Sequence, residues 1–138
     1  MTIKTASGGA VLKPDELPIH HRGGGAHTTP LVTSETGAAR FITGYTAFDP
    51  SAKIPFHKHN CEESVVLIEG DAMLDIDDRE YRMKPLDASF IPADVPHRFR
   101  NLSDTQPMKI LWIYARVDAT RTIMDTGVTA PVSAEHKK

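Results

Sequence analysis

The stretch His57–Gly70, HKHNCEESVVLIEG, decides the fold because histidines and glutamates stand directly before an apolar run that ends at a glycine. On an extended strand, residues two apart point to the same face, so His57 and His59 lie about 6.6 Å apart along the chain. Glu63 has the same parity, but a straight strand would carry it about 13 Å beyond His59. Metal–ligand bonds are only about 2.0–2.2 Å long, so the three can share an ion only if the chain folds back. We therefore expect a corner at residues 60–62, where Asn tolerates turn geometry, and a new strand that opens at Glu63.

His97 is a fourth candidate ligand. It opens the segment HRFRN (97–101), in which Phe99 and Asn101 share its face. Three imidazoles and one carboxylate suit a single divalent transition metal ion, and the ligand set alone does not choose among Fe, Mn, Ni, Cu and Zn. Glu62 has the wrong parity for this face, and it is the substitute ligand if Glu63 is not used.

Short apolar segments separated by turn signals fill the middle of the chain. No stretch of a dozen residues combines a 3.6-residue period with helix caps. The expected strands are 39–48, 64–70, 72–77, 80–83, 88–92, 97–101 and 108–117, with a hairpin tip at 77–79. Many short strands at regular spacing predict an all-β sandwich or barrel.

The chain divides into three zones. Residues 1–30 are rich in Gly, Pro, Thr and His and predict an irregular N-terminal arm, residues 31–117 form the β-barrel domain, and residues 118–138 form a polar C-terminal extension. The arm carries Arg22 and several histidines between His20 and His27, around three consecutive glycines. This composition favours a flexible segment. The alternative is that the arm folds across the barrel mouth and Arg22 meets an anionic substrate.

Length and composition limit the function classes. The 138 residues suit one domain, and 40% hydrophobic with 25% charged residues is typical of a globular protein. A formal net charge of −2 without a basic cluster argues against a nucleic-acid partner. The apolar runs are too short to span a bilayer, the N-terminus lacks a signal-peptide core, and the lone Cys61 cannot form an internal disulfide. We expect a cytoplasmic protein whose partner is a small molecule, with no nucleic acid and no membrane.

Two motifs in the sequence resemble those of the cupin family. The first, Gly-x5-His-x-His-x3-Glu-x6-Gly, is matched from His57 to Gly70, with Ser51 in place of the leading glycine. The second, Gly-x5-Pro-x-Gly-x2-His-x3-Asn, is matched at Pro92, His97 and Asn101, with Leu86 and Asp94 where glycines are usual. The departures fall at turn positions and leave the candidate ligands in place, and Asp can adopt the positive φ that Gly serves.

The resemblance implies a cupin-type double-stranded β-helix, also called a jelly-roll barrel, with the metal held inside by His57, His59, Glu63 and His97. It also implies frequent assembly as a dimer, and extended arms at both ends of the chain suit arm exchange in a homodimer. Cupins include dioxygenases, isomerases, epimerases, lyases, decarboxylases and binding modules, so the resemblance does not name the reaction.

The leading hypothesis is a metal-dependent enzyme that acts on a small oxygenated metabolite. The metal would act as a Lewis acid, as in isomerases and lyases, or would bind O₂, as in dioxygenases. The alternatives are a non-catalytic small-molecule-binding or sensor barrel with a structural metal, and a subunit of a larger enzyme. Candidate substrate contacts are Arg22, Phe99, Trp112 and Tyr114. Trp112 and Tyr114 share a face of one strand, which favours packing in the core over stacking on a ligand.

Overall fold

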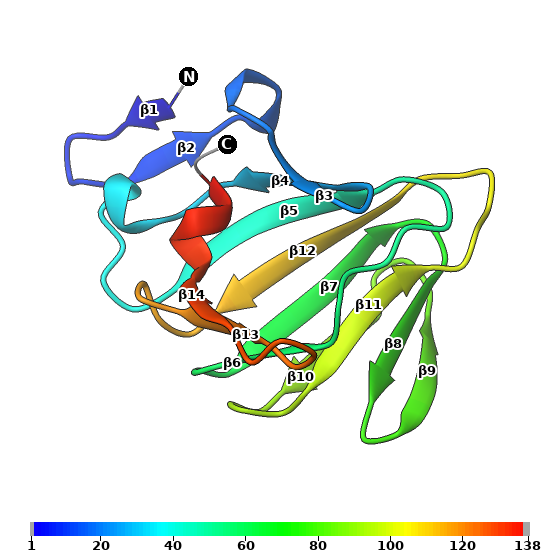
Figure 1. Ribbon diagram of the computed structural model, residues 1–138. Coiled ribbons are helices and arrows are strands. Elements are labelled where there is room, and N and C mark those ends of the chain that lie inside the picture. Colours follow the sequence, from blue (N-terminus) through cyan, green and yellow to red (C-terminus); the bar gives the residue numbers. More distant parts are fainter. Residues whose placement is uncertain (1, 137–138) are drawn as a thin grey trace.

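Two six-stranded antiparallel sheets face each other in the computed structural model, which describes residues 2–136 and the side chains of residues 2–134 (Figure 1). The first sheet has the order β10 (Ala88–Ile91), β7 (Glu63–Glu69), β12 (Met108–Tyr114), β5 (Ile42–Phe48), β4 (Ala26–Pro30) and β3 (His20–Gly23). The second has the order β14 (Thr129–Pro131), β13 (Thr120–Ile123), β6 (His57–His59), β11 (His97–Asn101), β8 (Ala72–Ile76) and β9 (Arg79–Met83). A separate hairpin pairs β1 (Thr2–Lys4) with β2 (Ala10–Leu12), and three 3₁₀ helices complete the fold: η1 (Pro14–Glu16), η2 (Ser34–Thr36) and η3 (Val132–His136).

The core lies between the two sheets. Along β5 and β12, buried and partly buried residues alternate over the whole strand, as expected when one face of a sheet packs inward. Phe48, Leu67 and Met108 are fully buried there. The all-β barrel architecture predicted from the sequence is therefore confirmed.

The expected strands of the central zone are all present, with boundaries that differ by at most a few residues. The hairpin tip between β8 and β9 is the two-residue loop Asp77-Asp78, and both residues have positive φ, at 56° and 59°. Positive φ at both positions is the signature of a type I′ turn, whose twist matches that of the flanking strands. Asp tolerates this conformation because its short polar side chain can form local hydrogen bonds.

The ends of the chain are more regular than their composition suggests. Residues 20–30, expected to be irregular, form β3 and β4, and β4 pairs with β5 along its whole length. The tight turn between them is made by Gly23, Gly24 and Gly25, all with positive φ. Glycine is the residue that adopts this conformation without steric cost, so the glycine run marks a turn between strands. At the other end, residues 120–131 contribute β13 and β14 to the second sheet.

Three residues that stand at glycine positions of the two motifs adopt the backbone conformation that glycine favours. Ser51 has φ 63°, Leu86 has φ 77° and Asp94 has φ 65°. The turns therefore keep their geometry although the glycines are replaced, and the cost appears as backbone strain.

Among the described residues, no helix is long and apolar enough to cross a membrane.

Candidate metal centre

Three histidines converge inside the barrel from two adjacent strands of the second sheet. His57 and His59 occupy the inward positions of β6, and His97 opens β11 directly opposite His57. Their exposed fractions are 3%, 2% and 1%. One ring nitrogen from each lies within 4.8 Å of the others, so the three histidines could hold a metal ion.

Backbone carbonyl groups orient all three rings. The Nδ1 atom of each ring lies 2.8–2.9 Å from a carbonyl oxygen, which belongs to Pro55 for His57, Thr120 for His59 and Val95 for His97. Because a carbonyl oxygen only accepts, Nδ1 must carry the proton, and in a neutral ring Nε2 then bears the lone pair. This is the arrangement that metal-binding histidines use to fix tautomer and ring direction.

Glu63 reaches the histidines from the opposite sheet. It is the first residue of β7, and its Oε1 lies 2.8 Å from Nε2 of His97 while its Oε2 lies 3.7 Å from Nε2 of His59. The chain turns between β6 and β7 at residues 60–62, as predicted, and the backbone N–H of Thr120 donates to the side-chain oxygen of Asn60 at 2.8 Å. The corner therefore sends the chain from one sheet to the other and brings Glu63 back to the histidines.

Burial and mutual charge perturb these groups strongly. Burial, together with the neighbouring His97 and His59, holds the pKa of His57 well below its usual value. Burial alone would raise the pKa of Glu63, but its hydrogen bond with His97 and the charges of His59 and His97 lower it. Burial would lower the pKa of His97, and its contact with Glu63 raises it. The carboxylate is thus held in its ionised form inside the barrel.

The donor set fits a cation. With the His97 Nδ1 donating to Val95, the Nε2 of a neutral ring and the Glu63 Oε1 are both acceptors, and they face each other at 2.8 Å. Two buried acceptors at this distance require a proton or a metal ion to share. Imidazole nitrogens and one carboxylate are ligands that Zn, Fe, Mn, Ni and Cu accept.

Aromatic side chains line the cluster on the side of the first sheet. The ring of Tyr114 lies 4.5 Å from that of His59, and Tyr114 also hydrogen-bonds to Glu63. Trp112 stacks on Tyr114 at 4.9 Å, and its Nε1–H donates to the Thr46 hydroxyl at 2.9 Å. These two residues pack in the core, as predicted from their position on one face of the same strand.

The remaining weak candidates are Phe99 and Arg22. Phe99 is 2% exposed, and its ring centroid is 6.3 Å from that of His97. Arg22 lies on β3, partly buried. Contact of Arg22, Phe99, Trp112 or Tyr114 with a substrate stays a prediction.

Arg121 is a neighbour of the cluster that neither sequence motif marks. In the register of β13 with β6, Arg121 stands opposite His59 and Ile123 stands opposite His57. The backbone carbonyl of Thr120, which orients His59, belongs to the same strand. The segment TRTI (120–123) is rich in β-branched residues, and this strand signal was available within the polar C-terminal zone.

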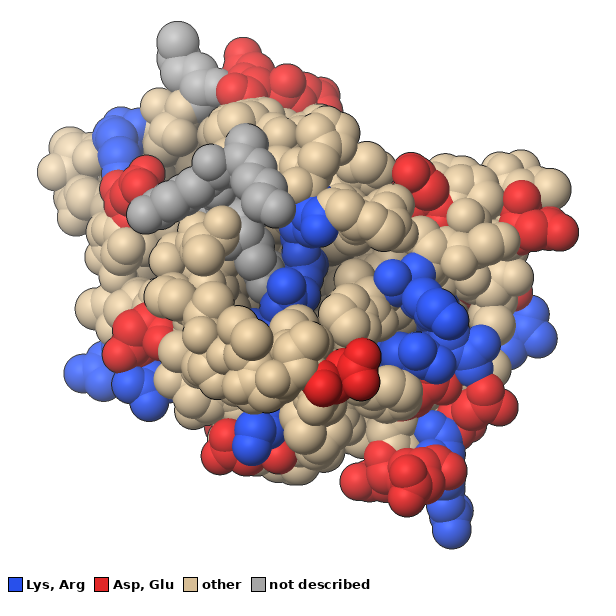
Figure 2. Space-filling view, viewed as in Figure 1, with Lys and Arg blue, Asp and Glu red and all other residues tan. Residues whose placement is uncertain are grey.

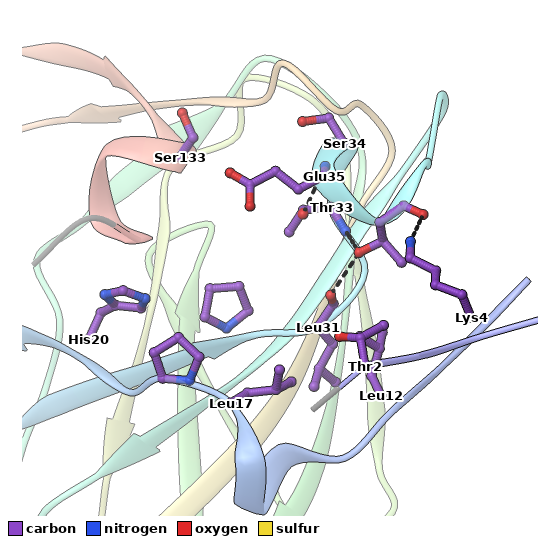
Figure 3. A pocket seen from close by; sticks show the side chains of 13 residues that line it. Thr2, Lys4, Leu12, Leu17, His20, Leu31, Thr33, Ser34, Glu35 and Ser133 are labelled. Carbon is purple, nitrogen blue, oxygen red and sulfur yellow. Dashed lines mark hydrogen bonds between the residues drawn. The ribbon is translucent and has the colours of Figure 1, made fainter. Parts of the chain in front are cut away.

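A cavity of about 400 Å³ lies between the N-terminal hairpin, η2 and η3. Figure 3 shows it lined by Leu12, Leu17 and Leu31, with the Glu35 side chain extending into the space. None of the four candidate ligands lines this cavity. This cavity is therefore not the site of the chemistry that the buried cluster offers.

Comparison with known proteins adds a family and several relatives. The family model for the cupin domain matches residues 44–114. Protein SchB of Streptomyces halstedii is 31% identical over 93 residues, which cover 67% of each chain. The polyketide synthase CurC of Streptomyces cyaneus is 30% identical over 97 residues, which cover 70% of this chain and 63% of that protein. The chain thus spans about two thirds of the length of these relatives.

A solved structure shares the fold. The polyketide cyclase RemF of Streptomyces resistomycificus superposes with a TM-score of 0.71, over 88% of this chain and 84% of that one, at 22% sequence identity. The two-sheet barrel described above is therefore found in that structure as well.

Proposed function

The chain belongs to the cupin family, and from this premise we propose that it is a metal-dependent enzyme acting on a carbonyl group of a small oxygenated metabolite. The proposed ligands are His57, His59 and His97 with Glu63 as the fourth. The observation that carries the proposal is the convergence of three buried imidazole nitrogens within 4.8 Å, each oriented by a backbone carbonyl. A bound divalent transition metal would supply Lewis-acid polarisation of a carbonyl oxygen and stabilisation of the enolate.

The protein's own residues prepare the site for this chemistry. Each histidine ring is held in one tautomer by its Nδ1 hydrogen bond, so the ligand directions are set before any ion binds. The cluster is almost completely removed from solvent, and the rings of Trp112 and Tyr114 keep bulk water away from it on one side. Electrostatic stabilisation of developing negative charge is strongest in such a dry site.

Similarity to CurC supports a carbonyl substrate. That relative is named a polyketide synthase, and polyketide chains carry many carbonyl groups that cyclise or isomerise through enolates. We therefore favour Lewis-acid chemistry of the isomerase or lyase type over O₂-dependent chemistry. Iron in the purified protein, together with substrate-dependent O₂ consumption, would reverse this preference in favour of a dioxygenase.

Elemental analysis of protein purified without a histidine tag tests the proposal. We expect about one equivalent of a transition metal in the wild type and its loss in His57→Ala/His59→Ala. The matched control is His21→Ala/His27→Ala, which removes two histidines of the β3–β4 hairpin and leaves the cluster intact. The proposal would be contradicted if the wild-type protein held no metal and the variants His57→Ala and His97→Ala stayed well folded. A non-catalytic binding barrel would then remain.

We further propose that the protein acts as a homodimer in the cytoplasm, as expected from the family and from the extended ends of the chain. In this structure β3 pairs with β4, and β4 pairs with β5 of the same chain, so an exchange of arms would have to replace the pairing of β4 with β5. Light scattering measures the mass directly, and a monomeric mass would contradict the homodimer.

A further inference from the structure

The Glu63 carboxylate is a buried charge, and Tyr114 contacts it from the neighbouring strand. Figure 2 shows acidic side chains spread over the drawn surface, whereas Glu63 is 4% exposed. In the register of β12 with β7, Tyr114 stands directly opposite Glu63, so both side chains point to the same face. The Tyr114 hydroxyl hydrogen-bonds to the carboxylate, and it donates because a carboxylate only accepts. A buried charge is tolerated only where such partners compensate it.

The ring of Tyr114 contacts a candidate ligand and a second aromatic ring. Its centroid is 4.5 Å from that of His59 and 4.9 Å from that of Trp112, and the planes of the Tyr114 and Trp112 rings differ by 17°. Both Tyr114 and Trp112 are buried, so neither ring can turn without disturbing the close packing around it. The place of the Tyr114 hydroxyl therefore depends on where the indole of Trp112 lies.

Two residues of β5 fix the indole. Gly44 stands opposite Trp112 in the strand register, and a Cβ at Gly44 would lie 2.2 Å from Cζ2 and 2.6 Å from Cη2 of the indole. The missing side chain at this strand position thus leaves the room that the ring occupies. The indole Nε1–H donates to the Thr46 hydroxyl at 2.9 Å, and the Thr46 hydroxyl oxygen lies 3.0 Å from that of Thr28. These hydrogen bonds are buried, and their loss would leave the indole N–H without its acceptor.

We propose that Tyr114 is a positioning residue of the metal centre, whose hydroxyl holds the Glu63 carboxylate toward the ion. Trp112 in turn holds the Tyr114 ring, and Gly44 and Thr46 hold Trp112. The inference rests on the proposed function, because it assigns these residues a role toward the metal ligands. Groups that hydrogen-bond to metal ligands orient them, and their loss typically lowers metal affinity about 10–100-fold. Both motifs lie between residues 51 and 101, so they mark none of the four residues that support Glu63.

Competition with a chromophoric chelator for Co²⁺ tests the positioning role without any substrate. Tyr114→Phe removes only the hydroxyl, and we expect the affinity for Co²⁺ to fall about ten-fold or more. The visible absorption spectrum of bound Co²⁺ should also change, because the carboxylate ligand is no longer held in one direction. Tyr45→Phe is the matched control: Tyr45 alternates with the buried residues of β5 and so faces the outer side of the sheet. Its affinity and spectrum should equal those of the wild type.

A double-mutant cycle tests the path through Trp112. Thr46→Val removes the acceptor of the indole N–H, and we expect the affinity for Co²⁺ to fall about three-fold, the order of coupling between residues in contact. In the Tyr114→Phe background the same substitution should have almost no effect on affinity, whereas Thr46→Ser, which keeps the hydroxyl, should bind like the wild type. Gly44→Ala should lower the affinity as well, because the new Cβ displaces the indole. The matched control is Thr43→Val on the same strand, where the Thr43 hydroxyl accepts from the backbone N–H of Val32 at 3.2 Å.

The outcomes separate this inference from the proposed function. Urea unfolding of each variant shows that it is folded under the conditions of the competition. Wild-type protein that binds no Co²⁺ overturns both proposals. Equal affinity and an unchanged spectrum in Tyr114→Phe overturn the positioning role alone, and an equal loss from Thr46→Val in both backgrounds overturns the path through Trp112. Co²⁺ binding that depends on the Tyr114 hydroxyl supports the positioning role even where the protein has no enzymatic activity.

Discussion

Oε1 of Glu63 lies 2.8 Å from Nε2 of His97, although the two residues belong to opposite sheets of the barrel. This contact is the link that brings a carboxylate to a cluster otherwise built from one sheet. The substitution Glu63→Gln keeps the size of the side chain and removes its charge. We expect the affinity for a divalent transition metal to fall at least about ten-fold, because even partners of metal ligands contribute 10–100-fold. Competition with a chromophoric chelator measures the affinity.

Glu62→Gln is the matched control for this substitution. Glu62 is the adjacent glutamate in the sequence, but its side chain is exposed at the corner between β6 and β7. We expect its metal affinity to equal that of the wild type. A loss of affinity in Glu62→Gln but not in Glu63→Gln would show that the carboxylate ligand is Glu62 and not Glu63.

A second ionic group stabilises the outer face of the second sheet. Asp75 on β8 is 9% exposed at its side chain and accepts hydrogen bonds from Nε of both Arg98 and Arg100 on β11, each at 2.8 Å. Asp75→Asn would leave two guanidinium groups without their shared carboxylate. We expect the free energy of unfolding to fall by about 1–3 kcal/mol, as for other buried groups that lose a charged partner. Urea denaturation measures the change, and Asp118→Asn, which removes an exposed ion pair with Arg116, should have a much smaller effect.

The same carboxylate makes stability depend on pH. The hydrogen bond from Arg100, aided by that from Arg98, holds the pKa of Asp75 below its usual value against the opposing effect of burial. A lowered pKa in the folded state contributes stability above the unfolded-state pKa of about 3.9, and this stability is lost as the pH falls through the folded-state pKa. The difference in unfolding free energy between wild type and Asp75→Asn should therefore be constant near neutral pH and shrink below roughly pH 4. A difference that grows on acidification would contradict the assignment.

The fold and the ligand cluster were predictable because their signals are local. The strands of the central zone are marked by β-branched and apolar runs between turn residues, and the structure places them within a few residues of the expected bounds. The corner at residues 60–62 followed from distance alone, since a straight strand cannot bring Glu63 to His59.

Asn101, matched in the second motif, has a structural role: its side-chain amide donates to the carbonyl groups of Gln106 and Asp49, at 2.8 Å and 3.1 Å.

The parts that sequence reasoning missed depend on long-range pairing. β3 and β4 contain few apolar residues, and their strands form because β5 offers an unpaired edge. Likewise, Arg121 reaches the cluster only because β13 pairs with β6, more than sixty positions earlier in the chain. Neither pairing can be inferred from its own segment alone, so the sequence predicted an irregular N-terminal arm and a polar C-terminal extension.

Backbone strain at Leu86 gives the last prediction. Lys84 to Asp87 form a turn in which the Asp87 N–H donates to the Lys84 carbonyl at 2.9 Å, with Pro85 second and Leu86 third at φ 77°. A proline followed by a residue with positive φ is the pattern of a type II turn, in which the third position favours glycine. The Leu86 side chain is 79% exposed, so it contributes little packing to offset the strain. Leu86→Gly should raise the free energy of unfolding by about 1 kcal/mol, the order of the left-handed penalty for a residue with a Cβ. Leu86→Ala keeps the Cβ and removes the exposed side chain, so it should leave stability unchanged; an equal gain in both variants would assign the effect to the exposed side chain and not to the backbone.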